Sequence, residues 1–167
     1  MARKLEDLEA AMDLKSAIRG SYIAQGLSDD QLEKLYAIAE IRTFADGEPL
    51  MTQDAEERDL FVVVDGRARI LSITGETIGM VTPGMPIGEI SFIDGRPRSV
   101  SVIGDGPCEA VVLPAEPLWK MLRENQDIAT TALLNVARVL CARLRSANRN
   151  LATLMALDEL DSPSATR

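Results

Sequence analysis

Three patterns of apolar residues divide the chain. In the first, apolar residues recur at steps of three and four, which predicts a helix over residues 5–19 and a second helix capped by Ser28. Over residues 41–114 the pattern changes to short β-branched runs with glycine or proline at nearly every junction. The helical period returns over residues 116–159. The sequence therefore predicts helices on both sides of an all-β region.

Turn signals separate the predicted strands. Asp65-Gly66 interrupts "LFVVVDGRARIL" and Gly75 interrupts "ILSITGETIGMV", and each interruption predicts a hairpin. Asp105-Gly106-Pro107 separates two further runs, Ser99–Gly104 and Cys108–Pro114. Many short strands at regular spacing are typical of a sandwich or a small barrel. We therefore expect an α+β fold, in which a β-roll or jelly-roll barrel is flanked by N-terminal helices and a long C-terminal helix.

The same patterns give the expected division of the chain. It comprises an N-terminal helical extension over 1–25, a β-roll with its lead-in helix over 26–114, C-terminal helices over 115–160 and a disordered tail over 161–167. Asn125-Gln126-Asp127 is expected to break the C-terminal segment into a short helix and a main helix. The main helix carries a heptad-like seam of Leu133, Ala137, Leu140, Leu144, Ala147, Leu151 and Leu154. This spacing favours a homodimer through the C-terminal helix, although packing against the barrel would give the same pattern.

Composition narrows the classes of function. The chain has 26 acidic and 18 basic residues, a net charge of −8, which disfavours nucleic acid as a direct partner. It has no histidine, and Cys108 and Cys141 lack metal-ligand spacing, so we expect no metal site and no enzyme of the histidine-dependent β-helix type. We expect both cysteines to be buried fillers. Few cysteines, no signal peptide and no membrane-spanning run favour a cytoplasmic protein without membrane insertion.

One connection between strand pairs carries candidate chemistry: "PIGEISFIDGRPRS", residues Pro86–Ser99. A short helix that begins near Gly88 would direct several backbone N–H groups toward one point, and such a helix start attracts an anion. Arg98 adds a planar, bidentate donor for the same anion. The carboxylate of Glu89 accepts hydrogen bonds from hydroxyl groups and would suit a ribose 2′-hydroxyl. Together these residues predict a pocket for a nucleoside monophosphate.

The stretch "GEISFIDGRPRSVSV" resembles the phosphate-binding cassette of the cyclic nucleotide-binding domain family, which includes the sensor domains of the catabolite activator protein and of protein kinase A regulatory subunits. The resemblance extends over about residues 26–154. It implies that Arg98 binds the cyclic phosphate and that Glu89 binds the 2′-hydroxyl. The other ligand-binding residues that it implies are Gly88, Ile90, Ser91, Ser99, Val100 and, on the C-terminal helix near the base, Arg143.

The resemblance implies a stand-alone cyclic-nucleotide sensor without catalytic residues, which acts through a separate effector protein. The ligand is cAMP or cGMP, and Ser99 leaves this choice open; no other cofactor is expected. The alternative is a ligand-free interaction or scaffold module that keeps the fold and assembles through its helices. Val100 favours this alternative, because it is bulkier than the alanine usual in the family at that position.

Overall fold

The computed structural model describes residues 14–161. The predicted first helix is therefore seen only over residues 14–20, and the predicted tail beyond residue 161 lies outside the described residues. A short 3-10 helix, η1 (Tyr22–Ala24), leads into helix α2 (Asp29–Tyr36). The Ser28 hydroxyl accepts a hydrogen bond from the Gln31 N–H, and the Gln31 side chain accepts one from the Ser28 N–H. This capping box confirms the predicted start of the second helix.

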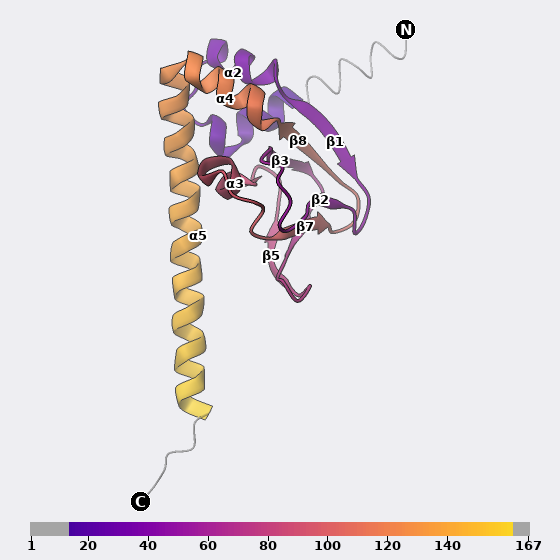
Figure 1. Ribbon diagram of the computed structural model, residues 1–167, viewed down its shortest axis with the longest axis vertical. Helices are drawn as coiled ribbons and strands as arrows, with labels where there is room; N and C mark the ends of the chain where they lie inside the picture. Colours follow the sequence, from indigo (N-terminus) through magenta and orange to yellow (C-terminus); the bar gives the residue numbers. More distant parts are fainter. Residues whose placement is uncertain (1–13, 162–167) are drawn as a thin grey trace, which may run out of the picture.

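The β region forms two antiparallel sheets of four strands each (Figure 1). The first sheet has the order β1 (Glu40–Phe44), β8 (Cys108–Leu113), β3 (Leu60–Asp65) and β6 (Pro86–Ile87). The second has the order β2 (Pro49–Met51), β7 (Ser101–Gly104), β4 (Ala68–Leu71) and β5 (Thr77–Val81). The predicted fold class is confirmed, as two sheets with flanking helices and not as a closed barrel.

The turn between β3 and β4 differs from the prediction. The predicted hairpin at Asp65-Gly66 is wrong, because β3 pairs with β6 and β8 in the first sheet whereas β4 pairs with β5 and β7 in the second. Gly66 lies where the chain passes from the first sheet to the second. Its φ is 71°, and a Cβ at this position would lie 2.3 Å from the carbonyl oxygen of Pro107. The hairpin at Gly75 is confirmed, since β4 and β5 pair directly.

The two central strands of the first sheet, β3 and β8, are buried on both faces because they lie between two layers. On β3, Leu60 and Val62 join a core cluster formed with the helices, whereas Phe61 and Val63 join a cluster formed with the second sheet. Alternate residues of a strand point to opposite faces, so a strand covered on both sides is apolar without interruption. This explains the unbroken run "LFVVV" of β3.

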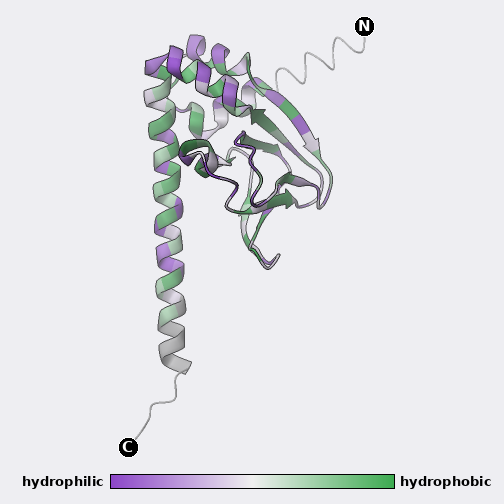
Figure 2. Ribbon diagram, in the orientation of Figure 1, coloured by the Kyte–Doolittle hydropathy of each residue, from purple (hydrophilic) through white to green (hydrophobic). Residues whose placement is uncertain are grey.

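The C-terminal segment breaks at Asn125, as predicted, into α4 (Ala115–Glu124) and α5 (Gln126–Asp161). The first turns of α5 pack on the core through Ile128, Ala132 and Val136, and the helix then extends past the β-sheets (Figure 1). Hydrophobic residues continue along this free part (Figure 2). Among the described residues, no helix is both long and apolar enough to cross a membrane.

The predicted heptad seam changes from packed to exposed along α5. Leu140 packs against the helical core cluster, whereas Leu144 and Leu151 are exposed. Cys108 is buried as predicted, but the prediction for Cys141 is wrong, because that residue is exposed. A row of exposed residues at alternating steps of three and four, which we call the exposed seam, shares Ala137, Leu144 and Leu151 with the predicted seam: Leu134, Ala137, Cys141, Leu144, Asn148, Leu151 and Met155.

Candidate functional site

The cassette begins with a left-handed glycine. Gly88 has a φ of 87° and is the N-cap of α3 (Glu89–Asp94), which confirms the short helix expected there. A Cβ at this position would lie 2.6 Å from Nη1 of Arg98 and 2.6 Å from the carbonyl oxygen of Asp59. Glycine is therefore required both for the backbone conformation and for the close approach of Arg98.

Among the described residues, Arg98 is a buried cation without an ion-pair partner. Its side chain is only 2% exposed; Nη2 donates to the carbonyl oxygen of Asp59 at 2.7 Å, and Nη1 donates to that of Gly88 at 3.2 Å. Nε is buried and has no hydrogen-bond partner, and no ion pair in the described part of the chain includes Arg98. Burial lowers the pKa of the guanidinium, an effect that nearby carboxylates, Asp59 first, oppose. An anion at Nε would satisfy the free donor and compensate the charge.

The backbone of Arg98 is held by the loop between β2 and β3. Its N–H donates to the carbonyl oxygen of Ala55, and its carbonyl oxygen accepts from the N–H of Asp54, both at 2.9 Å. Asp59, at the end of this loop, also accepts the N–H of Ala115 on its carboxylate at 2.8 Å. Asp59 thus joins Arg98 to the first turn of α4. Sequence analysis missed this residue, because nothing in the acidic run "DAEERD" distinguishes one carboxylate from the others.

Glu89, 1% exposed, is paired by the long C-terminal helix. Nη1 of Arg143 donates to its carboxylate, and Nη2 of Arg143 donates to the carbonyl oxygen of Pro86 at 2.6 Å. The resemblance had implied that Arg143 lies near the base of a nucleotide. The side chain of Arg143 instead extends from α5 to the cassette. There it pairs with the carboxylate of Glu89, which was predicted to bind a ribose hydroxyl.

One cavity brings the predicted residues together. All of them line it: Gly88, Glu89, Ile90, Ser91, Arg98, Ser99, Val100 and Arg143. Four apolar residues that sequence analysis missed complete the lining: Met51, Ile70, Ile87 and Val102. Val102 could have been predicted, because it lies at an inward-facing position of its strand. The cavity volume is only about 40 Å³, close to the space of a single water molecule and too small for a nucleotide, and we call this arrangement the closed state.

The cassette helix also contacts α4. The ring of Phe92 on α3 stacks on that of Trp119 on α4, with a centroid distance of 4.6 Å and an interplanar angle of 15°. The cassette is therefore joined to α4 through Phe92 and to α5 through Glu89. Within the described residues no group of three side chains has the composition and placement to hold a metal ion. The site thus places a buried guanidinium, Arg98, and a buried carboxylate, Glu89, on one cavity.

Comparisons with known proteins indicate the family of the chain. The family described as "Cyclic nucleotide-binding domain" matches residues 41–125. Glutaminase 1 of Bradyrhizobium diazoefficiens is 28% identical over 126 residues, which cover 75% of this chain and 20% of the glutaminase. The cyclic AMP receptor protein of Thermus thermophilus is 26% identical over 80% of this chain and 62% of its own length. The chain thus spans a fifth of the first relative and less than two thirds of the second.

Solved structures show the same fold. A cyclic nucleotide-binding domain from Methylobacillus flagellatus superposes with a TM-score of 0.75 at 21% identity, over 87% of this chain and 84% of that one. The matched family segment runs from β1 to the end of α4 and contains the whole cassette with Glu89 and Arg98. Sequence, fold and cassette geometry therefore lead to one assignment: the chain belongs to the cyclic nucleotide-binding domain family.

Proposed function

We propose that the protein is a regulatory sensor that binds cAMP or cGMP in the cassette cavity. The observation that carries the proposal is Arg98, a buried guanidinium with a free Nε and no carboxylate partner. A cyclic phosphate would supply the missing acceptor and the negative charge. Ser91 and Ser99 line the same cavity, and Glu89, which also lines it, can accept a ribose 2′-hydroxyl.

The closed cavity implies two states. A cyclic nucleotide does not fit into about 40 Å³, so the cassette and the side chain of Arg143 must separate before the ligand enters. The ligand then shifts the equilibrium between closed and open states by its differential affinity for the two. Because α3 contacts Trp119 on α4 and Arg143 on α5, a change in the cassette alters both helices. That a separate effector protein reads this change, in the cytoplasm, stays a prediction from the sequence.

Calorimetric titration with cAMP and cGMP tests the proposal. We expect one of them to bind with one site per chain. The matching 2′-deoxy cyclic nucleotide should bind about tenfold more weakly, because the buried Glu89 then loses its hydroxyl partner. The linear 5′-monophosphate serves as a second control for the shape of the phosphate. Equal affinities for the ribo and deoxy ligands would contradict the role of Glu89.

The alternative is a ligand-free interaction module. The small cavity and Val100 in its wall favour this function. If neither cyclic nucleotide gives heat or raises the unfolding temperature at millimolar concentration, the sensor proposal fails and the alternative is supported. In that case Arg143 and Glu89 act as a permanent structural pair between α5 and the cassette.

We further propose that two chains associate in parallel through the exposed seam of α5. Leucines at 53% to 62% exposure recur with Ala137 and Cys141 at heptad spacing on a helix that extends past the sheets. A second copy of the same helix covers such a row by knobs-into-holes packing. Asn148 is the polar position in this row, and one buried asparagine in an apolar seam favours two strands in a fixed register.

Leu144→Lys is expected to convert the dimer into monomers, because it would place two like charges inside the apolar seam. Sedimentation velocity measures the change. Thr153→Lys, an exposed position of α5 outside the seam, is the control and should leave a dimer.

A parallel dimer also places Cys141 beside its copy, so copper phenanthroline should oxidise the two thiols to an intermolecular disulfide. Burial raises the pKa of the Cys108 thiol, which therefore does not compete. Wild-type protein that sediments as a monomer would contradict the proposal.

A further inference from the structure

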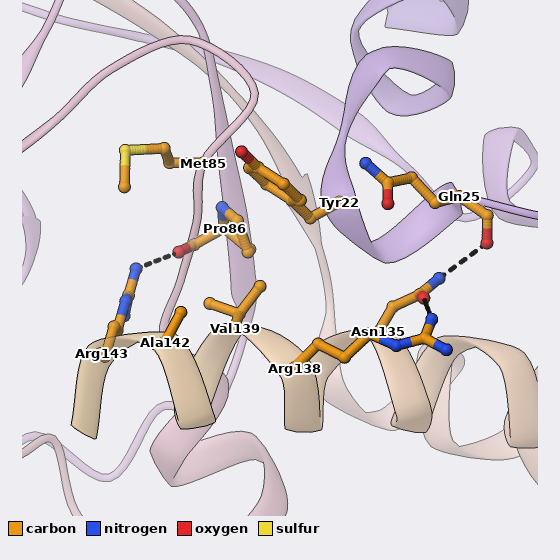
Figure 3. A pocket seen from close by; sticks show the side chains of 9 residues that line it. All are labelled: Tyr22, Gln25, Met85, Pro86, Asn135, Arg138, Val139, Ala142 and Arg143. Carbon is orange, nitrogen blue, oxygen red and sulfur yellow. Dashed lines mark hydrogen bonds between the residues drawn. The ribbon is translucent and has the colours of Figure 1, made fainter. Parts of the chain in front are cut away.

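A second cavity, drawn in Figure 3, is lined by Arg143 as the cassette cavity is. Its volume is about 300 Å³, at the lower end of the range for small-molecule sites. Val139 and Ala142 of α5 form one wall, and Tyr22 of η1 with Met85 and Pro86 forms the facing wall (Figure 3). These walls are apolar or aromatic, so the cavity suits a flat apolar group.

The charges around this cavity have one sign. Of the described residues that line it, the charged ones are Arg138 and Arg143, on successive turns of α5. Nη1 of Arg138 donates to Oδ1 of Asn135 at 2.8 Å, a neutral partner, and no ion pair in the described part of the chain includes Arg138. The amide of Asn135 is fixed in turn, since Nδ2 donates to the carbonyl oxygens of Gln25 at 2.7 Å and Ile23 at 3.3 Å. The wall that holds Arg138 is therefore preorganised and lacks an anion.

We propose that this cavity is an accessory binding site for a small organic anion with a flat apolar body, of the class of aromatic carboxylates. The ring would lie between Val139 and Tyr22, and the carboxylate would pair with Arg138 or Arg143. The two cavities share Arg143 as their common lining residue. None of the residues of the exposed seam lines the accessory cavity, so a dimer through that seam leaves it open.

The shared arginine couples the accessory site to the cassette. Arg143 holds Glu89 with one nitrogen and the Pro86 carbonyl with the other. A carboxylate in the accessory cavity competes with Glu89 for this guanidinium and, when it succeeds, frees Glu89 for a ribose hydroxyl. The anion and the cyclic nucleotide would then strengthen each other's binding by the same factor. This coupling rests on the proposed nucleotide site, whereas the accessory site does not.

The experiment is a titration of the ¹⁵N-labelled 167-residue chain with 2-naphthoate, followed by amide chemical shifts. We expect saturable shifts of the amide signals that centre on Met85, Ile87 and residues 138–143. Ala142→Phe fills the cavity and should weaken binding at least about tenfold, and Arg138→Gln should weaken it about fivefold. The neutral analogue 2-naphthylmethanol should bind more weakly than the carboxylate. Thr153→Phe, an exposed aromatic on the same helix, should leave the affinity unchanged.

Absent shifts, shifts that follow the exposed seam, or an affinity that Ala142→Phe leaves unchanged would overturn the accessory site. Glu89→Gln tests the coupling without any nucleotide. It removes the charged partner of Arg143 and should tighten 2-naphthoate binding about threefold. An unchanged dissociation constant in Glu89→Gln would overturn the coupling. Because no cyclic nucleotide is present, failure of the sensor proposal would not alter any of these results.

Discussion

Replacing Arg98 with alanine is expected to lower the affinity for the cyclic nucleotide at least a hundredfold, about 3 kcal/mol of binding free energy. The reason is burial: the side chain is 2% exposed, and Nε is a free donor at the cavity. A phosphate placed there without the guanidinium would be a buried anion without its counter-charge. Calorimetry on wild type and variant measures the loss.

Two controls separate binding from folding. Arg96→Ala removes the same charge two residues earlier, from an exposed side chain, and should leave the affinity within about twofold of wild type. Arg98→Gln keeps an amide donor for the carbonyl oxygens of Gly88 and Asp59 but loses the charge. It should therefore unfold near the wild-type temperature and still bind poorly. Nucleotide affinity that survives in Arg98→Gln would show that the phosphate contacts lie elsewhere.

The cassette was predictable because its residues lie close together in the sequence. Gly88, Glu89 and Arg98 fall within one connection, and the structure places all three on one cavity. The helix that begins after Gly88 was also predictable, since the residue types required for a helix start are local. Arg143 came only from the resemblance, and its contact with Glu89 spans 54 positions of the sequence. No local pattern encodes a pairing of that kind.

The errors have physical causes as well. Asp65-Gly66 has the residue types of a tight hairpin, but the same left-handed glycine serves a crossing between two sheets, and only the pairing of β4 with β7 distinguishes the two. On α5, the helix is apolar on more than one side over its first turns, because Leu140 packs on the core while Cys141 is exposed. Leucine spacing alone therefore could not separate the core face from the exposed seam.

Gly88→Ala should have the largest effect on stability, a loss of about 3 kcal/mol in the free energy of unfolding. Alanine at a φ of 87° is strained, and its Cβ would lie 2.6 Å from both Nη1 of Arg98 and the carbonyl oxygen of Asp59. One of these neighbours is backbone that is tied to α4 through the Asp59 carboxylate, so it cannot move freely. Urea unfolding at fixed protein concentration measures the loss.

Gly75→Ala separates the two causes. Gly75 has a nearly equal φ of 83°, but a Cβ there meets nothing within 4 Å. Gly75→Ala should therefore lower the free energy of unfolding only by the cost of placing alanine in a left-handed conformation, about 1 kcal/mol. The remaining loss in Gly88→Ala would then measure how tightly the cassette is packed around Arg98. Because relief of this contact displaces the guanidinium, Gly88→Ala should also weaken nucleotide binding, whereas Gly75→Ala should not. Equal destabilisation by the two substitutions would mean that the cassette yields around Arg98, and that the closed cavity opens at little cost.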